Sequence, residues 1–532
     1  MALFGKWSRR ALLQSSGLAA AAPIAALTPA AAQAQGAAGA VSLPRLTGHE
    51  RDNLFTRIGV RPLINARGTY TIISGSRSLP EVKRAMYEAS HYYVQLDEMM
   101  DGIGARLAQL TGAEWGIVTT GCEAAICLAT IACIAGTDIE KVQALPLVKA
   151  KDQVIIPNHS RNQYDIGVRM MGTEVVEVAS PEELRAKISA RTAMIYIMAG
   201  PRASTGPLST ANICAIAKER GIPVFVDAAA EEPVRPNIHL AAGATLVGYS
   251  GGKCLRGPQS SGMLIGDKSL CKAAYFQAAP HHAYGRALKC SKEEAMGLLA
   301  AVEQWYKRDH AAEQKMWRGW LQTIEARLKP LPSTTFEYLE PNDLSNRAPR
   351  LRVRWDATRL GITGTELQAK LDAAPQRILL ESAQGRRPDA MASSLSIMPY
   401  MMDPGEDRIV ADAIFAILSN PGRFSDPPVP IGAMASIGGA WAVTVTYPHG
   451  EATHRFTLEQ SGAEVTGQHR GELYGGAIRG LVRAGTVELR SSMQIPANNI
   501  GWTFRGNVSG NRMSGTADMG EYGAAQWTAV KA

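Results

Sequence analysis

The stretch Tyr249-Ser-Gly-Gly-Lys253-Cys-Leu-Arg-Gly-Pro-Gln-Ser-Ser-Gly262 places one lysine in a glycine-rich segment between two apolar runs. The first run ends at Tyr249, and the second is Met263-Leu-Ile265. This pattern predicts a tight turn between two buried strands, with Lys253 at the end of the first. Burial makes a lysine amine more nucleophilic because it disfavours the charged form. We therefore expect Lys253 to bond covalently to a carbonyl group, although glycines also surround lysines in ordinary surface turns.

Two segments upstream support a covalent cofactor. Pro223-Val-Phe-Val-Asp227 is typical of a buried parallel strand that ends in an acid, and such an acid can keep a pyridine nitrogen protonated. Gly116-Ile-Val-Thr-Thr-Gly121-Cys-Glu-Ala-Ala-Ile126 is typical of a strand, a glycine turn and a helix whose first N–H groups bind phosphate. Together these segments predict a pyridoxal 5'-phosphate site. Its expected cofactor-binding residues are Gly121, Cys122, Glu123, Asp227, Ser250 and Lys253, although Ser250 would alternatively stabilise the turn.

The segment from about Gly104 to Gly266 alternates apolar runs with stretches of helical period. The apolar runs are Ile117-Val118, Val154-Ile-Ile156, Val175-Val176, Ala193-Met-Ile-Tyr-Ile197, Val224-Phe-Val226, Leu246-Val247 and Met263-Leu-Ile265. Seven candidate strands with crossover helices predict an α/β fold with a mostly parallel sheet. Ligands gather at the carboxyl ends of such strands, and Gly121, His159, Asp227 and Lys253 each follow one.

Several collinear segments carry a family resemblance. They are Ile64-Asn-Ala-Arg-Gly-Thr-Tyr-Thr71, Leu110-Thr-Gly-Ala-Glu114, Val226-Asp-Ala-Ala-Ala230, Ser250-Gly-Gly-Lys253 with Gly257-Pro-Gln-Ser-Ser-Gly262, and Gly285-Arg-Ala-Leu-Lys289 with Lys292-Glu-Glu294. From about Ile58 to Asn420 the chain resembles the family of L-seryl-tRNA(Sec) selenium transferase and D-glucosaminate-6-phosphate ammonia-lyase. This family is a branch of the fold-type I (aspartate aminotransferase-like) pyridoxal phosphate enzymes. The resemblance indicates a fold and a cofactor more firmly than a substrate.

The resemblance also implies roles for three further residues. An aromatic ring at the position of His159 stacks on the cofactor ring in fold-type I enzymes, whereas the alternative is a loop histidine bonded to backbone. An arginine of the small domain usually binds the substrate carboxylate, for which we select Arg352 in Arg350-Leu-Arg-Val-Arg-Trp355, although the spacing does not show which arginine points inward. Arg67 is a candidate for the mouth of the site. The fold also implies a homodimer or larger assembly.

Composition predicts five parts. They are a signal peptide (1–34), a cofactor-binding large domain (50–290), a small α+β domain (291–422) that begins with a long helix over 292–329, a proline-rich linker (423–437) and a C-terminal β domain (438–532). In the last part, Trp441–Tyr447, Thr453–Glu459 and Gly501–Phe504 alternate in polarity between glycine turns, which predicts a small antiparallel barrel or sandwich. We expect His449, His454 and His469 to be surface residues, because they lack the spacing of metal ligands.

The N-terminus predicts export. A twin arginine in Ser8-Arg-Arg-Ala-Leu-Leu13, an alanine-rich apolar segment and Ala32-Gln-Ala34 together are typical of a twin-arginine signal peptide, which indicates the periplasm. The net charge of +8 is spread along the chain without a dense basic run, which disfavours nucleic-acid binding. The seven cysteines lack CxxC spacing and indicate neither a disulfide framework nor a zinc site, so we expect no metal.

The expected function is a pyridoxal phosphate-dependent lyase of the ammonia-lyase or dehydratase type, acting on an amino acid or amino sugar acid. Lys253 would serve as general base, and Asp227 would keep the nitrogen of the cofactor ring protonated. One alternative is an aldolase or racemase, which shares the first steps. Another is an exported binding protein that retains the fold without catalysis. Selenium transfer is disfavoured, because seryl-tRNA is cytosolic and this chain is expected to be exported.

Overall fold

The computed structural model describes residues 48, 50, 52–147, 150–342, 344–388, 390–426, 428 and 431–532. The predicted signal peptide lies outside these residues. The described residues up to Pro62 belong to a unit of their own, which contains the short helix η2 (Thr56–Ile58). In the described part of the chain, no helix is both long and apolar enough to cross a bilayer.

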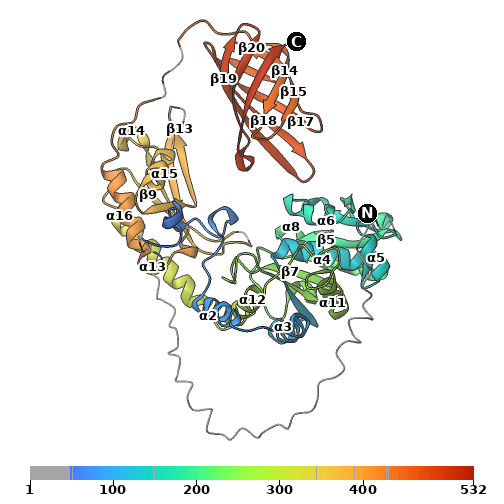
Figure 1. Ribbon diagram of the computed structural model, residues 1–532. Coiled ribbons are helices and arrows are strands. Elements are labelled where there is room, and N and C mark those ends of the chain that lie inside the picture. The colour runs from blue at the N-terminus through green and yellow to red at the C-terminus, as the bar shows by residue number, and fades with distance from the viewer. Residues whose placement is uncertain are drawn as a thin grey trace, which may run out of the picture. The chain divides into compact units, whose positions relative to one another are not determined.

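The large domain is built on a sheet of seven strands in the order β2-β8-β7-β6-β5-β3-β4 (Figure 1). Its strands are β2 (Trp115–Thr119), β3 (Gln153–Pro157), β4 (Glu174–Val178), β5 (Thr192–Met198), β6 (Val224–Asp227), β7 (Leu246–Ser250) and β8 (Gly262–Gly266). Each of the seven predicted apolar runs lies in one of these strands. Strand β8 is antiparallel to both β7 and β2, and the other pairs are parallel. Consequently β2, β3, β6 and β7 run in one direction, and their carboxyl ends meet at one edge.

Helices precede, connect and follow these strands. They are α2 (Pro80–Ala89), α3 (Leu96–Thr111), α4 (Cys122–Ala135), α5 (Ile139–Ala144), α6 (Ile166–Arg169), α7 (Pro181–Lys187), α8 (Pro201–Ser204), α9 (Thr210–Glu219), α10 (Ile238–Ala241), α11 (Lys268–Gln277) and α12 (Lys292–Trp305), with short 3-10 turns η3 (Thr71–Ile73), η4 (Asn158–Ser160) and η5 (Gln163–Asp165). In α4 every residue except Glu123 is buried. A helix that is apolar on all sides belongs in the core, and this one begins at the edge where the strand ends meet.

The small domain has its own apolar core around Leu351, Val353 and Ile397. Its four-stranded antiparallel sheet has the order β12-β13-β10-β9, and a separate parallel pair joins β1 to β11. The strands are β1 (Leu63–Ala66), β9 (Thr335–Leu339), β10 (Arg350–Asp356), β11 (Arg377–Leu380), β12 (Ser382–Arg386) and β13 (Ala390–Ile397), and the helices are α13 (His310–Leu328), α14 (Ala357–Leu360), α15 (Gly364–Ala373), η6 (Pro399–Met401) and α16 (Glu406–Ser419).

The long helix predicted over 292–329 is two helices. It is interrupted between Trp305 and His310, where the Asp309 side chain caps the start of α13 by accepting from the Ala312 N–H. Arg308 forms an ion pair with Glu313 across the same junction. An aspartate cap satisfies backbone N–H groups that a continuous helix would bond internally, so the chain restarts there.

The C-terminal part is a closed barrel of antiparallel strands, β14 to β21, shown in red in Figure 1. The strands are β14 (Gly439–Thr446), β15 (Glu451–Ser461), β16 (Glu464–Arg470), β17 (Gly475–Arg483), β18 (Thr486–Ile495), β19 (Asn498–Ser509), β20 (Arg512–Asp518) and β21 (Ala524–Lys531), with η7 (Gly520–Tyr522) before the last. Trp441, Phe456, Phe504 and Trp527 fill its interior.

The expectation that the barrel histidines are surface residues is wrong for two of them. His454 and His469 are 7% and 1% exposed, and only His449 is exposed. His454 shares the inward face of β15 with Phe456 and Leu458, because side chains two residues apart point to the same side of a strand.

Candidate active site

The turn that carries Lys253 is held by its own backbone. The Gly251 N–H donates to the Ser261 carbonyl at 2.7 Å, and the Gly257 N–H donates to the Gly251 carbonyl at 2.8 Å. A Cβ on Gly251 would lie 2.1 Å from the Ser261 Oγ, so no other residue fits there. The glycines therefore close the turn tightly, directly after Ser250 at the end of β7, and leave Lys253 half-buried.

A second segment, which we call the strap (residues 67–79), lies against this turn. The Ser76 N–H donates to the Gly252 carbonyl at 3.0 Å, and the Leu79 N–H donates to the Arg256 carbonyl at 3.2 Å. The Gln259 side chain donates to the Thr71 carbonyl at 3.2 Å. At its other end the strap contacts the small domain, where Asn346 Oδ1 accepts from the Thr69 N–H at 2.8 Å. The strap thus extends from the small domain to the lysine turn.

The strap contains two polar atoms that are buried without a hydrogen-bond partner among the described residues, Arg67 Nε and Ser76 Oγ. The Arg67 guanidinium lies 4.8 Å from the centre of the Tyr70 ring, which orients it by a cation–π contact. Unpartnered buried polar atoms are uncommon in folded proteins and are found where a ligand or water completes the site. Their position on the strap marks this segment as part of a binding site.

Asp227, at the end of β6, is 5% exposed and accepts three hydrogen bonds. The Tyr196 hydroxyl donates to Oδ2 at 2.8 Å, the Ala229 N–H donates to Oδ1 at 3.0 Å, and the Cys122 thiol donates to Oδ1 at 3.5 Å. Donors that bind a carboxylate favour its charged form. Burial and the charge of Asp227 raise the pKa values of Cys122 and Tyr196 well above their ordinary range, so both remain protonated donors.

The loop that follows β3 is connected to the same carboxylate. Asn162 Nδ2 donates to the Tyr196 hydroxyl at 3.3 Å and to the Ser160 carbonyl at 2.7 Å. In this loop His159 is half-buried, with Nε2 3.1 Å from the Leu208 carbonyl and Nδ1 3.1 Å from Ser160 Oγ. Both ring nitrogens of His159 are therefore engaged, which fixes the orientation of the ring.

The start of α4 lies at the same sheet edge as Lys253 and Asp227. Gly121 has φ of 94°, in the left-handed region that favours glycine, and no side chain caps the first N–H groups of the helix. A Cβ on Gly262 would lie 2.5 Å from the Gly121 carbonyl carbon and 2.6 Å from the Cys122 nitrogen. Burial, and next the charge of Asp227, raise the pKa of Glu123. The uncapped N–H groups can bind an oxyanion.

These features fit pyridoxal phosphate. Three groups lie at the edge where strands β2, β6 and β7 end. They are the amine of Lys253 on its closed turn, the buried carboxylate of Asp227, which can accept from a further donor, and the uncapped start of α4. The amine suits the aldehyde of the cofactor, the carboxylate suits its protonated pyridine nitrogen, and the helix N–H groups suit its phosphate. In the described part of the chain, no group of three or more His, Cys, Asp or Glu side chains is arranged to hold a metal ion.

Arg352, which the sequence suggests for binding the substrate carboxylate, pairs with an acid of its own sheet. Its guanidinium is 3.5 Å from Glu337 on β9, and Arg354 pairs with the same carboxylate at 2.6 Å. Both arginines alternate along β10 with the buried residues Leu351 and Val353. The structure thus joins Arg352 to an ion-paired sheet face, whereas Arg67 belongs to the strap, in which Ser76 and Leu79 contact the lysine turn.

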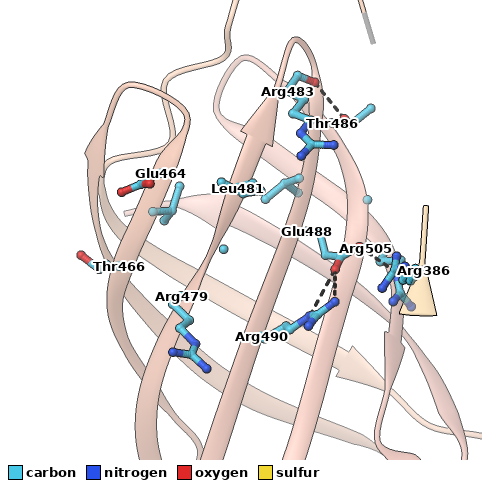
Figure 2. A pocket seen from close by; sticks show the side chains of 14 residues that line it. Arg386, Glu464, Thr466, Arg479, Leu481, Arg483, Thr486, Glu488, Arg490 and Arg505 are labelled. Carbon is cyan, nitrogen blue, oxygen red and sulfur yellow. Dashed lines mark hydrogen bonds and ion pairs between the residues drawn. The ribbon is translucent and has the colours of Figure 1, made fainter. Parts of the chain in front are cut away.

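A hollow on the outer face of the barrel is lined by strands β16 to β19 (Figure 2). Glu488 pairs with Arg490 at 2.8 Å and with Arg505 at 3.1 Å. Arg479 lies opposite Arg490 across β17 and β18. Charged pairs on such an open surface contribute little to stability, and no residue that we predict to hold the cofactor is located here.

Sequence reasoning missed Tyr196, Asn162 and Ser76. Tyr196 belongs to an apolar run, which indicates strand core and no more, although buried tyrosine hydroxyls usually need a partner. Asn162 and Ser76 are in loops whose path is set by tertiary contacts. Tyr196 lies in the strand next to that of Asp227, but only the pairing register of β5 and β6 brings its hydroxyl to that acid.

None of the known family models matches this chain. D-glucosaminate-6-phosphate ammonia lyase of Salmonella typhimurium is 29% identical over 333 residues, which are 60% of this chain and 86% of that protein. 5'-C-glycyluridine monooxygenase-decarboxylase of a Streptomyces species is 29% identical over 377 residues, 67% of this chain and 90% of that protein. L-seryl-tRNA(Sec) selenium transferase of Edwardsiella ictaluri is 28% identical over 233 residues, 40% of this chain and 47% of that protein.

Among solved structures, D-glucosaminate-6-phosphate ammonia-lyase superposes with a TM-score of 0.59 and 26% identity, covering 70% of this chain and 99% of that chain. The match agrees with the seven-stranded, mostly parallel sheet described above.

Proposed function

We propose that this chain, which has the fold-type I architecture and has pyridoxal phosphate as its expected cofactor, is a lyase that releases ammonia from an amino acid or amino sugar acid. The observation that carries the proposal is the meeting of Lys253, Asp227 and the start of α4 at one sheet edge. The similarity to an ammonia-lyase along 86% of that protein supports the choice of reaction.

Lys253, Asp227 and the start of α4 would each have a distinct task. When bound, pyridoxal phosphate would supply an electron sink for a carbanion at the substrate Cα. Lys253 would provide the attachment point and, once displaced by the substrate amine, would take the α-proton on Nζ as general base. Asp227 would keep the ring nitrogen protonated. Gly121, Cys122 and Glu123 would offer N–H groups to the phosphate, together with the Ser250 hydroxyl at the end of β7.

The net reaction would be an elimination followed by hydrolysis. Lys253 would take up the α-proton, and a β-hydroxyl would leave as water after taking up a proton. The resulting enamine gains water and loses ammonia, which yields a 2-oxo acid. No external oxidant is required, because the α-carbon is oxidised and the β-carbon is reduced within one molecule.

Two residues would position the cofactor and substrate. His159, whose ring is fixed through both nitrogens, would stack on the cofactor ring. Arg67 would bind the substrate carboxylate, because a guanidinium provides a planar pair of donors. Arg352 remains the alternative suggested by the sequence, but its guanidinium pairs with Glu337.

We further propose that the enzyme is exported to the periplasm and works as a homodimer or larger assembly. Export rests on the N-terminal twin arginine and the alanine-rich segment. The folded holoenzyme would use a route that carries folded proteins, since the cofactor is held by many contacts. The oligomer rests on the usual location of the site at a two-fold interface in this fold.

The test begins with the absorption spectrum of the purified protein beside that of Lys253→Ala. A visible cofactor band that is present in the wild type and lost in the variant would support the covalent role of Lys253. The wild type is then incubated with L- and D-amino acids and amino sugar acids while ammonia and 2-oxo acid are measured. A wild type that stays colourless when pyridoxal phosphate is supplied would contradict the enzyme proposal and favour a binding protein.

A second candidate is oxidative decarboxylation, favoured by the match to 90% of the monooxygenase-decarboxylase. Oxygen uptake with release of carbon dioxide from a panel member would identify it. An aldehyde formed from a β-hydroxy amino acid without ammonia would identify an aldolase, and loss of optical activity alone would identify a racemase.

A further inference from the structure

We propose that Tyr196 and Asn162 are positioning residues that hold the Asp227 carboxylate against the ring nitrogen of the bound cofactor, and that they connect this contact to the loop of His159. The proposal requires the cofactor but does not require the elimination reaction.

The hydrogen bonds of Asp227 leave room for one more donor. A carboxylate offers about four acceptor positions, and Tyr196, Ala229 and Cys122 occupy three of them. A protonated ring nitrogen is the donor that the remaining position suits. Of the three donors in place, the Tyr196 hydroxyl makes the shortest contact, 2.8 Å, whereas the thiol of Cys122 is a weak donor at 3.5 Å.

Asn162 fixes the direction of the Tyr196 proton. A hydroxyl has one proton and two lone pairs, so it could donate to several neighbours. Because Asn162 Nδ2 donates to the hydroxyl oxygen at 3.3 Å, the tyrosine proton is left for Asp227. The Asn162 amide oxygen accepts from the Tyr164 N–H at 2.7 Å, which anchors the side chain. The Tyr196 ring is stacked 6.0 Å from the Phe225 ring, so it has little freedom to turn away.

The charges around Asp227 make this support necessary. Glu123, at the start of α4, interacts unfavourably with Asp227, and the pKa of Glu123 is raised in consequence after the larger effect of burial. The charge of Lys253 lowers the pKa of the Cys122 thiol, against the larger opposing effects of burial and of Asp227. Donors that point at a buried carboxylate beside a second acid offset the repulsion between the two acids. The hydroxyl of Tyr196 is the strongest side-chain donor present.

The same contacts reach the opposite side of the site. Asn162 donates to the Ser160 carbonyl, and Ser160 Oγ lies 3.1 Å from His159 Nδ1. The residue predicted to stack on the cofactor ring and the residue predicted to bind its nitrogen are therefore held by one chain of hydrogen bonds. Loss of Asn162 would disturb both, whereas loss of the Tyr196 hydroxyl would disturb only the nitrogen contact.

The experiment uses Tyr196→Phe, which removes the hydroxyl and keeps the ring. The holoenzyme is titrated with pH while the visible band of the bound cofactor is recorded. We expect the midpoint to rise by at most about one pH unit, because the lost hydrogen bond acts on Asp227 and affects the titrating nitrogen only through the ring. The direction follows because a less positive ring holds the proton on the nitrogen that links Lys253 to the cofactor more tightly.

The matched control is Tyr249→Phe. Tyr249 is also a fully buried strand tyrosine, 2% exposed, and its hydroxyl accepts from Asn237 Nδ2 at 2.7 Å instead of contacting Asp227. This variant should leave the midpoint unchanged. Cys122→Ala should move it in the same direction by less than Tyr196→Phe. If Tyr196→Phe does not fold, Asn162→Ala provides the second test, with a smaller rise expected.

Three outcomes would overturn the proposal. The first is a midpoint of Tyr196→Phe, or of Asn162→Ala in its place, that equals the midpoint of the wild type. The second is an equal shift of the midpoint in Tyr249→Phe, which would indicate a general effect of a lost buried hydroxyl. Either result leaves the lyase proposal standing. A wild type without any cofactor band would overturn both, because the cofactor assignment itself would fail.

Discussion

Inside the C-terminal barrel, Nε2 of His469 lies 2.8 Å from Nδ1 of His454, and Nδ1 of His469 lies 2.9 Å from Ser491 Oγ. Burial and, next, the neighbouring His454 lower the pKa of His469 from 6.5 to about 3, and burial lowers that of His454. Both rings are therefore neutral in the folded barrel at neutral pH.

The pair predicts that the barrel loses stability in mild acid. The pKa of His469 is lower in the folded barrel than in the unfolded chain, so the unfolded chain binds more protons and stability falls as pH drops from about 6.5 towards 3. The loss is at most about 1.4 kcal/mol per pH unit for each ring. The full chain would be unfolded in urea at neutral and at acidic pH and then labelled by brief deuterium pulses at one fixed pH. The deuterium uptake of peptides from the barrel would report the loss of stability. His449→Gln, at an exposed position, should keep the pH dependence, whereas His469→Gln should weaken it. An acid-insensitive midpoint would contradict the assignment.

A second prediction separates Arg67 from Arg352. Once a substrate is found, Arg67→Gln should raise KM by about 10- to 100-fold, because a charge-assisted contact to a carboxylate is lost. Arg352→Gln should change KM little, since its guanidinium pairs with Glu337 on the small-domain sheet. Steady-state kinetics of both variants decide the point, and the cofactor band serves as a control for folding. A large KM effect confined to Arg352→Gln would reverse the assignment.

The cysteines lead to a third prediction, that native thiols react slowly. Six of the seven are buried, and burial raises the pKa of Cys254, beside Lys253, to about 12. Cys290 is half-buried, although burial raises its pKa to about 12 as well. A thiol reagent applied at mildly alkaline pH should modify Cys290 first, and all seven only after denaturation. Cys290→Ser should abolish the early phase. Rapid modification of Cys254 would show that the lysine turn opens in solution.

The sequence predicted the parts of this fold that depend on local pattern. Buried parallel strands are continuous apolar runs, so all seven were located, and glycine turns marked both Lys253 and Gly121. The interruption after Trp305 was missed, because the residues around Asp309 remain compatible with a helix until the cap is seen. The inward position of His454 was missed. The alternation of side chains along β15 indicates it, since His454 is two residues from the apolar Phe456.

The contacts that complete the active site were beyond reach for a different reason. Whether Tyr196 faces Asp227 depends on the register of β5 and β6, in which Met198 lies opposite Asp227. Whether the segment that carries Arg67 passes the lysine turn depends on the path of the strap, whose contacts to that turn are made by Ser76 and Leu79. Neither is encoded in local periodicity, because both are set by pairing between segments distant in the sequence.

The fourth prediction concerns Gly262, which lets the strand after the lysine turn pass close to the start of α4. A Cβ there would lie 2.5 Å from the Gly121 carbonyl carbon and 2.6 Å from the Cys122 nitrogen, and both neighbours are backbone atoms that cannot turn aside. Gly262→Ala should therefore displace the start of α4 and weaken phosphate binding, so the variant should need at least about tenfold more pyridoxal phosphate to develop its band. Gly319→Ala, where a Cβ meets nothing within 4 Å, is the control and should bind the cofactor like the wild type. Equal cofactor affinity in both variants would show that α4 does not hold the phosphate.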